Sequence, residues 1–138
     1  GLPMKQNGVM LLEALLGILI FSIGILGLMG LQAVSISNTI EARYRSEAGF
    51  LANQIVGRIW TDRAQLATYA LAAGTTCNTG TNTPLMEWVC QVEGALPGIT
   101  AAANRPTIEI ATDTVTVTVR WQLPNADARR FQVITRIN

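Results

Sequence analysis

The sequence predicts an α+β protein in which one long amino-terminal helix packs on a small head with a roughly three-stranded antiparallel sheet. The first observation is an apolar run: between Val9 and Ile40, Glu13 is the only charged residue. The second is that apolar residues keep helical spacing well beyond that run. The third is an alternation of apolar and polar residues in the last third of the chain, which is typical of half-buried strands.

The amino-terminal helix is predicted to continue from an apolar half into an amphipathic half. After the apolar run, apolar side chains recur at steps of three or four and form one stripe: Ile36, Ile40, Tyr44, Ala48, Leu51, Ile55 and Ile59. We therefore expect one helix from about Val9 to about Trp60, with an extension as far as Ala73. At 1.5 Å per residue, the part up to Trp60 would be about 78 Å long. A small domain cannot bury such a rod, so its amino half must lie in lipid or among other helices of this kind.

The middle of the chain is predicted to be a loop followed by a short helix. Gly74 to Thr83 has the composition of a loop. Pro84 suits the first turn of a helix that is capped by Asn82 or Thr83, and Pro97-Gly98 would end it. The buried face of this helix would carry Leu85, Val89, Val92 and Leu96.

The last third is predicted to form three antiparallel strands with one apolar face. Thr107 to Ala111 and Thr114 to Trp121 alternate, and Pro124 to Asp127 is a turn. In the last strand, the side chains expected to point toward the core are those of Phe131, Val133, Thr135 and Ile137. A small sheet of this kind needs cover on its apolar face, and the amphipathic half of the long helix is the obvious partner.

Several charged and aromatic residues around these elements receive structural interpretations. Arg129 and Arg130 open the last strand, where a solvated edge would discourage sheet-to-sheet pairing. Asp62 and Arg63 are expected to cap and solvate the end of the long helix. Three tryptophans are expected in the core, with a shared aromatic surface patch as the alternative: Trp60, Trp88 and Trp121.

Composition argues against catalysis and against nucleic-acid binding. The 138 residues carry a formal net charge of +1, which supplies no basic excess to hold nucleic acid. The chain has no histidine, the commonest general base and metal ligand. We find no catalytic constellation, metal-ligand spacing or phosphate-binding loop, so we expect neither enzymatic activity nor a cofactor.

The two cysteines, Cys77 and Cys90, are thirteen positions apart and have neither C-x-x-C nor zinc-ligand spacing. In an exported chain we expect them to form a disulfide, which requires an oxidising compartment such as a bacterial periplasm. The alternative is a pair of buried free thiols.

The apolar run is long enough to span a bilayer, which takes about 20 residues. Lys5 precedes it, so the amino end should stay in the cytoplasm while the rest is exported. Gly1 to Pro3 come before Met4 and would be an artificial addition or an alternative start. An ordinary secretory signal, cut near the small residues Ala33, Ser35 and Ser37, is the alternative to a membrane anchor.

Glu13 is the candidate functional residue because an ionised group among lipid tails is costly, at about 2.5–3.5 kcal/mol on insertion scales. Cutting the chain after Gly8 would give Val9 a positive amine, one helical turn before Glu13. Pairing with this amine or with that of a neighbouring subunit would fix the register of assembly. The alternative is a carboxylate that extends to the lipid headgroups. Three explanations stay open for the glycines of the apolar half: close helix packing, a segment that melts during assembly, or simply the composition of membrane helices. These glycines are Gly17, Gly24, Gly27 and Gly30.

The segment from Gly8 to Glu13, after a short leader with a lysine, resembles the processing signal of type IV pilins and pseudopilins. The resemblance implies a prepilin peptidase that cuts after Gly8 and methylates Val9, with Glu13 as the assembly residue. It implies a type IV pilin fold with a leader (1–8), a transmembrane and assembly segment (9–35) and a periplasmic head (36–138). The family's usual first mature residue is phenylalanine, so Val9 is a departure.

The aliphatic stretch that follows is most similar to minor pilins, which prime pilus assembly within a complex at the fibre tip. The implied partners are other minor pilins, the major pilin, the peptidase, inner-membrane lipid and a tip adhesin for cell adhesion. The implied location is the bacterial inner membrane, and then the pilus at the cell surface. The alternatives are a type II secretion pseudopilin of the GspI type and a membrane-anchored periplasmic binding domain.

Overall fold

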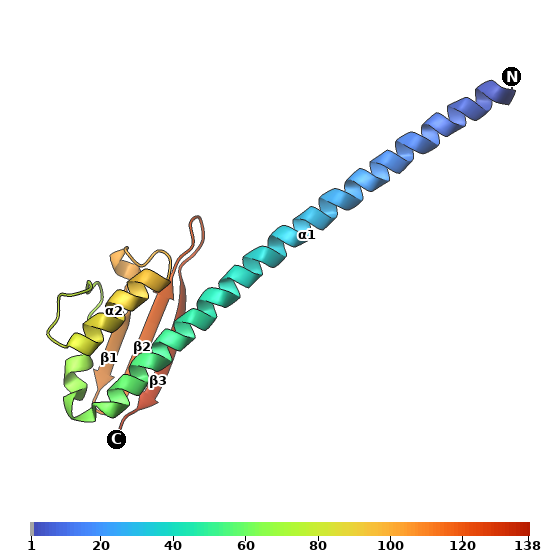
Figure 1. Ribbon diagram of the computed structural model, residues 1–138. Helices are drawn as coiled ribbons and strands as arrows, with labels where there is room; N and C mark the ends of the chain where they lie inside the picture. Colours follow the sequence, from blue (N-terminus) through green and yellow to red (C-terminus); the bar gives the residue numbers. More distant parts are fainter. Residues whose placement is uncertain (1) are drawn as a thin grey trace. The chain divides into compact units, whose positions relative to one another are not determined.

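The computed structural model describes the backbone of residues 2–138 and the side chains of residues 8–138. It confirms the α+β class (Figure 1). The chain forms two compact units, one that ends at Glu41 and one that runs from Ala42 to Asn138. In chain order the elements are α1 (Leu2–Thr61), the 3₁₀ helix η1 (Arg63–Tyr69), α2 (Thr83–Ala95), the 3₁₀ helix η2 (Ala102–Asn104), β1 (Thr107–Ala111), β2 (Thr114–Trp121) and β3 (Arg129–Arg136).

Helix α1 confirms the predicted continuous helix, but the extension to Ala73 is wrong. The helix ends at Thr61 because Asp62 leaves the helical region, with φ −133° and ψ 42°. The chain then turns back through η1 and brings Leu71 beside β1, where it forms an isolated bridge with Ile108. A straight helix would carry these residues past the sheet and leave its edge bare.

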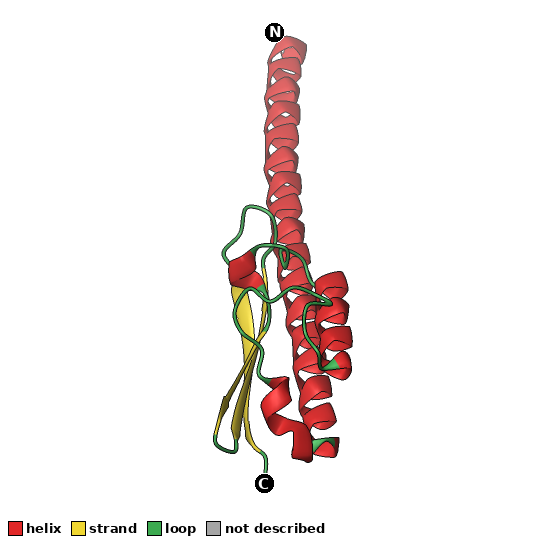
Figure 2. Ribbon diagram, turned by 90° about the vertical axis from the view of Figure 1, so that its left-hand side faces the viewer, coloured by secondary structure: helices red, strands yellow, loops and turns green. Residues whose placement is uncertain are grey.

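We call the second unit the head. In the head, helix α2 and the last turns of α1 lie on the same side of the sheet (Figure 2). The carboxyl-terminal part of the predicted apolar stripe is buried in the core of the head, and it consists of Ala48, Leu51, Ile55 and Ile59. Helix α1 lies close to β3 at Gly49, where an added Cβ would be in van der Waals contact with the ring of Phe131, at 3.4 Å. The stripe residues Ile36 and Ile40 belong to the other unit and are exposed.

Helix α2 forms as predicted and is anchored to α1. The Asn82 side chain caps it by accepting a hydrogen bond of 3.0 Å from the Leu85 amide, and Pro84 lies in the first turn. All four residues of the predicted face are buried. The Trp88 indole N–H donates to the main-chain oxygen of Leu51 at 2.8 Å, which ties α2 to α1 inside the core.

The sheet has the order β1-β2-β3, and both pairings are antiparallel. Strands β1 and β2 occupy the predicted ranges. The inward residues of the central strand β2 are fully buried, and they are Val115, Val117, Val119 and Trp121. On the edge strand β3, the inward residues Phe131 and Val133 are only partly buried.

Two structural interpretations need correction. Trp60 is 41% exposed and does not belong to the core, because its neighbour Ile59 is the residue that points inward. The guanidinium of Arg63 lies over its ring, 5.8 Å from the centroid. Asp62 makes no side-chain capping bond and instead accepts a hydrogen bond of 2.8 Å from the Tyr69 hydroxyl. The other two tryptophans are buried, as predicted.

Candidate functional site

The amino-terminal unit is a single helix whose apolar side chains have no cover within the described chain. From Val9 to Ile36, every large apolar side chain is at least 42% exposed. Within the described residues, this helix is also the one element that is long and apolar enough to cross a membrane. Because so much apolar surface is unstable in water, the unit needs lipid or other helices around it.

Glu13 lies one turn after Val9 on this helix and is exposed. No hydrogen bond or ion pair reaches its carboxylate from the described residues. Its surroundings along the helix are apolar and form a shallow surface with Val9, Leu12, Leu16, Gly17 and Ile20. A carboxylate in this setting is solvated only while the helix is alone, and it needs a positive partner once lipid or another helix covers the surface.

Three of the four candidate packing glycines share a helix face with Glu13. At 100° per residue, Gly17, Gly24 and Gly27 fall within about 40° of the Glu13 direction, whereas Gly30 lies about a quarter turn away. A Cβ added at any of these glycines would find no atom within 4 Å. The face is therefore open, and it combines one carboxylate with three positions where another backbone can approach closely.

The predicted processing site falls at the boundary of the described side chains. Gly8 and Val9 both lie inside α1. The side chains of the leader residues 1–7, including Lys5, are outside the described part of the chain. Cleavage after Gly8 and methylation of Val9 stay predictions.

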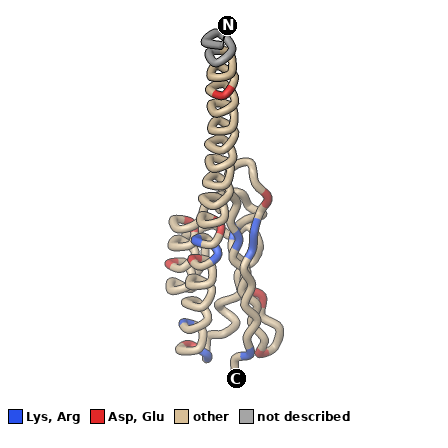
Figure 3. Tube along the Cα trace, turned by 90° about the vertical axis from the view of Figure 1, so that its right-hand side faces the viewer, with Lys and Arg blue, Asp and Glu red and all other residues tan. Residues whose placement is uncertain are grey.

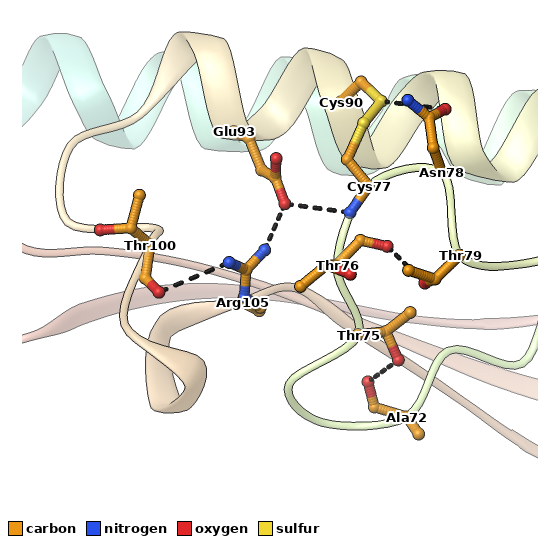
Figure 4. Close-up of polar contacts among 10 residues, drawn as sticks. All are labelled: Ala72, Thr75, Thr76, Cys77, Asn78, Thr79, Cys90, Glu93, Thr100 and Arg105. Atoms are coloured by element: carbon orange, nitrogen blue, oxygen red, sulfur yellow. Dashed lines mark hydrogen bonds and ion pairs between the residues drawn. A yellow bond between two sulfur atoms is a disulfide. The ribbon is translucent and has the colours of Figure 1, made fainter.

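In the head, Cys77 and Cys90 form a disulfide, so the free-thiol alternative is wrong (Figure 4). The Cys77 amide also donates to a carboxylate oxygen of Glu93 at 3.2 Å, and this oxygen forms an ion pair with Arg105. The disulfide loop, α2 and the segment before β1 are thus joined at one point. No pattern in the sequence marks Glu93 or Arg105, since their pairing depends on the fold.

Two polar side chains of the head, Tyr69 and Asp113, have pKa values that their surroundings shift. Burial, and next the hydrogen bond to Asp62, raise the pKa of Tyr69 above its ordinary value. At the sheet, the hydrogen bond from Arg136 lowers the pKa of Asp113. The described residues contain no group of three or more His, Cys, Asp or Glu side chains that could hold a metal ion.

Comparison with family models, with curated proteins and with solved structures gives no match for this chain.

Proposed function

We propose that this chain is a minor type IV pilin of the PilV type, which helps to initiate pilus assembly as part of a tip complex of minor pilins. The observation that carries the proposal is Glu13. It is the one charged residue between Val9 and Ile40, it lies one turn after Val9, and its face also holds Gly17, Gly24 and Gly27.

The chemistry of assembly follows from this placement. Cleavage after Gly8 would leave a protonated amine on Val9, in the same apolar layer as Glu13. An unpaired carboxylate in low dielectric is strongly disfavoured, whereas one paired with an amine is tolerated. Glu13 would pair with this amine or with the Val9 amine of a neighbouring helix. The neighbour's amine reaches Glu13 only at the right axial offset, so the pair selects register rather than adding much affinity. The glycines on the same face would let that helix come close.

The head fits export to an oxidising compartment, because its disulfide persists there. We propose that the unprocessed chain is held in the inner membrane with the head in the periplasm, and that it then enters the pilus. Helices would pack through residues 9–35, while the heads contact unlike subunits and, through them, a tip adhesin.

The test is Glu13→Ala in a host that makes pili, with Glu47→Ala as the matched control. Glu47 is an exposed carboxylate on the same helix, within the head. We expect peptidase cleavage of both variants, and loss from sheared pilus fractions for Glu13→Ala alone. Normal incorporation of Glu13→Ala would refute the assembly role.

Amino-terminal sequencing of the exported protein tests the processing step. A mature start at Val9 supports the pilin proposal, whereas an intact Met4 would favour a membrane-anchored periplasmic domain. The same processing would serve a type II secretion pseudopilin of the GspI type. Recovery with secretion pseudopili, and not with pili, would favour that function.

A further inference from the structure

The two edges of the head sheet differ in how their backbone groups are paired. At the β1 edge, Ile108 directs its N–H and C=O outward, and Leu71 binds both, at 3.1 and 2.9 Å. At the β3 edge, the hydrogen bond from the Ile137 amide to the Asp113 oxygen, 2.7 Å long, fixes which residues face β2. Because antiparallel pairs alternate, the residues that point their backbone groups outward are Arg130, Gln132, Ile134 and Arg136.

No hydrogen bond from the described residues reaches these outward N–H and C=O groups. The edge strand lacks proline and is as long as the central strand. Exposed edges with these properties are templates for another strand. One edge of this sheet is therefore closed by the chain itself, and the other is open.

The side chains of β3 also lack cover. Ile134 is 66% exposed on the face of the sheet opposite α1. On the inner face, Phe131 and Val133 are only half-buried, although their β2 partners Val119 and Val117 are fully buried. A strand added beside β3 would cover apolar side chains on both faces.

Charge defines the chemistry of the occupant. Basic positions lie toward both ends of the sheet (blue in Figure 3), and the outward row of β3 begins with Arg130 and ends with Arg136. The Arg136 guanidinium also forms an ion pair with Asp113 at 2.8 Å, so Arg130 is the stronger determinant of the two. Arg120 lies opposite Arg130 in the register and adds positive charge at that end. If two copies paired antiparallel and centred through β3, arginine would face arginine at both ends, which is unfavourable. A segment with acidic ends would meet no such penalty.

We propose that the open edge of β3 binds an extended segment of another protein as a fourth strand, with a short β-branched centre and acidic residues at both ends. Main-chain hydrogen bonds would supply affinity, and the flanking charges would supply choice of partner. The arginines would then have two effects, because they oppose self-pairing and favour an acidic partner. This proposal is independent of the pilin function.

The probe is a fluorescent peptide with two acidic residues at each end and a Thr-Val-Thr-Val-Thr centre, titrated against the full chain in neutral detergent micelles. Binding is followed by fluorescence anisotropy, and hydrogen exchange of the β3 amides reports its location. Two control peptides carry lysine at both ends or N-methyl groups on alternate amides. We expect each control to bind about tenfold more weakly, and the outward amides of Gln132 and Ile134 to be protected by the acidic peptide.

Protein variants locate the contact. Ile134→Pro removes an outward donor without breaking a bond to β2, and it should weaken binding at least as much as the N-methyl groups do. Arg130→Glu should weaken the acidic peptide about tenfold, while Arg43→Glu, the same change at an exposed site on α1, should not. Equal binding by the N-methylated peptide, no effect of Arg130→Glu, or no binding at millimolar peptide would each overturn the proposal.

Discussion

Gly98 offers a sharp test of the head structure. It follows the end of α2 with φ +72°, a conformation that L-residues with side chains rarely adopt. A Cβ there would lie 2.5 Å from the main-chain oxygen of Gln122 and 2.9 Å from its Cβ. Two hydrogen bonds keep the main chain at Gly98 from moving away from Gln122. The Gln122 amide donates to the Pro97 oxygen at 3.0 Å, and the Asn104 side chain donates to the Gly98 oxygen at 2.9 Å.

The expected magnitude comes from a comparison with Gly74, which has φ +78° but whose added Cβ would meet only Ala102, at 3.8 Å. Both alanine variants lose about 1–2 kcal/mol because of the left-handed backbone. Gly98→Ala adds an overlap with fixed main chain, which costs about 1–3 kcal/mol more. For a domain of about 100 residues, each kcal/mol lowers the midpoint of thermal unfolding by about 4–8 °C.

Thermal unfolding followed by tryptophan fluorescence is the suitable assay, because Trp88 and Trp121 are buried in the head. The helix outside the head would dominate circular dichroism and hide the transition. We expect Gly98→Ala to lower the midpoint about twice as far as Gly74→Ala. Equal shifts in the two variants would show that α2 and the segment after β2 do not approach as described.

Three further changes have defined outcomes. Replacing Cys77 and Cys90 with serine removes the cross-link and should lower the free energy of unfolding by up to about 3 kcal/mol, measured in urea; an unchanged midpoint would contradict this. Because burial raises the pKa of Tyr69, the folded state keeps this phenol protonated to higher pH than the unfolded state does. The contribution of Tyr69 to the free energy of unfolding should therefore be complete below about pH 10 and fall as the pH rises toward the pKa of the folded state. Tyr69→Phe should lessen this fall. Gly24 lies on the Glu13 face of the helix, whereas Gly30 does not. In piliated cells, Gly24→Leu should therefore block incorporation of the chain into pili, while Gly30→Leu should not. Equal incorporation of the two variants would remove the shared face from the proposal.

The local patterns predicted the elements well because each pattern depends on the environment of consecutive side chains. The alternation from Thr114 to Trp121 gave both ends of β2, since every second residue of a central strand must be buried. The first turn of α2 was likewise visible in Pro84. The cap was narrowed to Asn82 or Thr83, of which Asn82 makes the bond, because capping is a contact between residues three positions apart.

Features that depend on distant residues could not be predicted in this way. The end of α1 follows from the return of the chain to the sheet through Leu71, and no helix-stop residue marks Thr61. The exposure of Trp60 depends on which flank of α1 the sheet covers. The ion pair of Glu93 with Arg105 joins elements that only the fold brings together. Glu13 was prominent in the sequence because its anomaly is chemical, a lone charge in an apolar run.

The two proposed contacts use charge in different media, and salt should separate them. At the exposed β3 edge, the flanking arginines act in water, so raising salt from about 0.1 to 1 M shortens the screening length from about 10 to 3 Å. Peptide binding there should weaken, chiefly through Arg130, because Arg136 already forms an ion pair with Asp113. Glu13 would instead meet its amine in a layer that excludes ions, so pilus fibres assembled through it should resist the same salt. If salt dissociated the fibres while peptide binding stayed constant, the proposed roles of charge at these two sites would both be wrong.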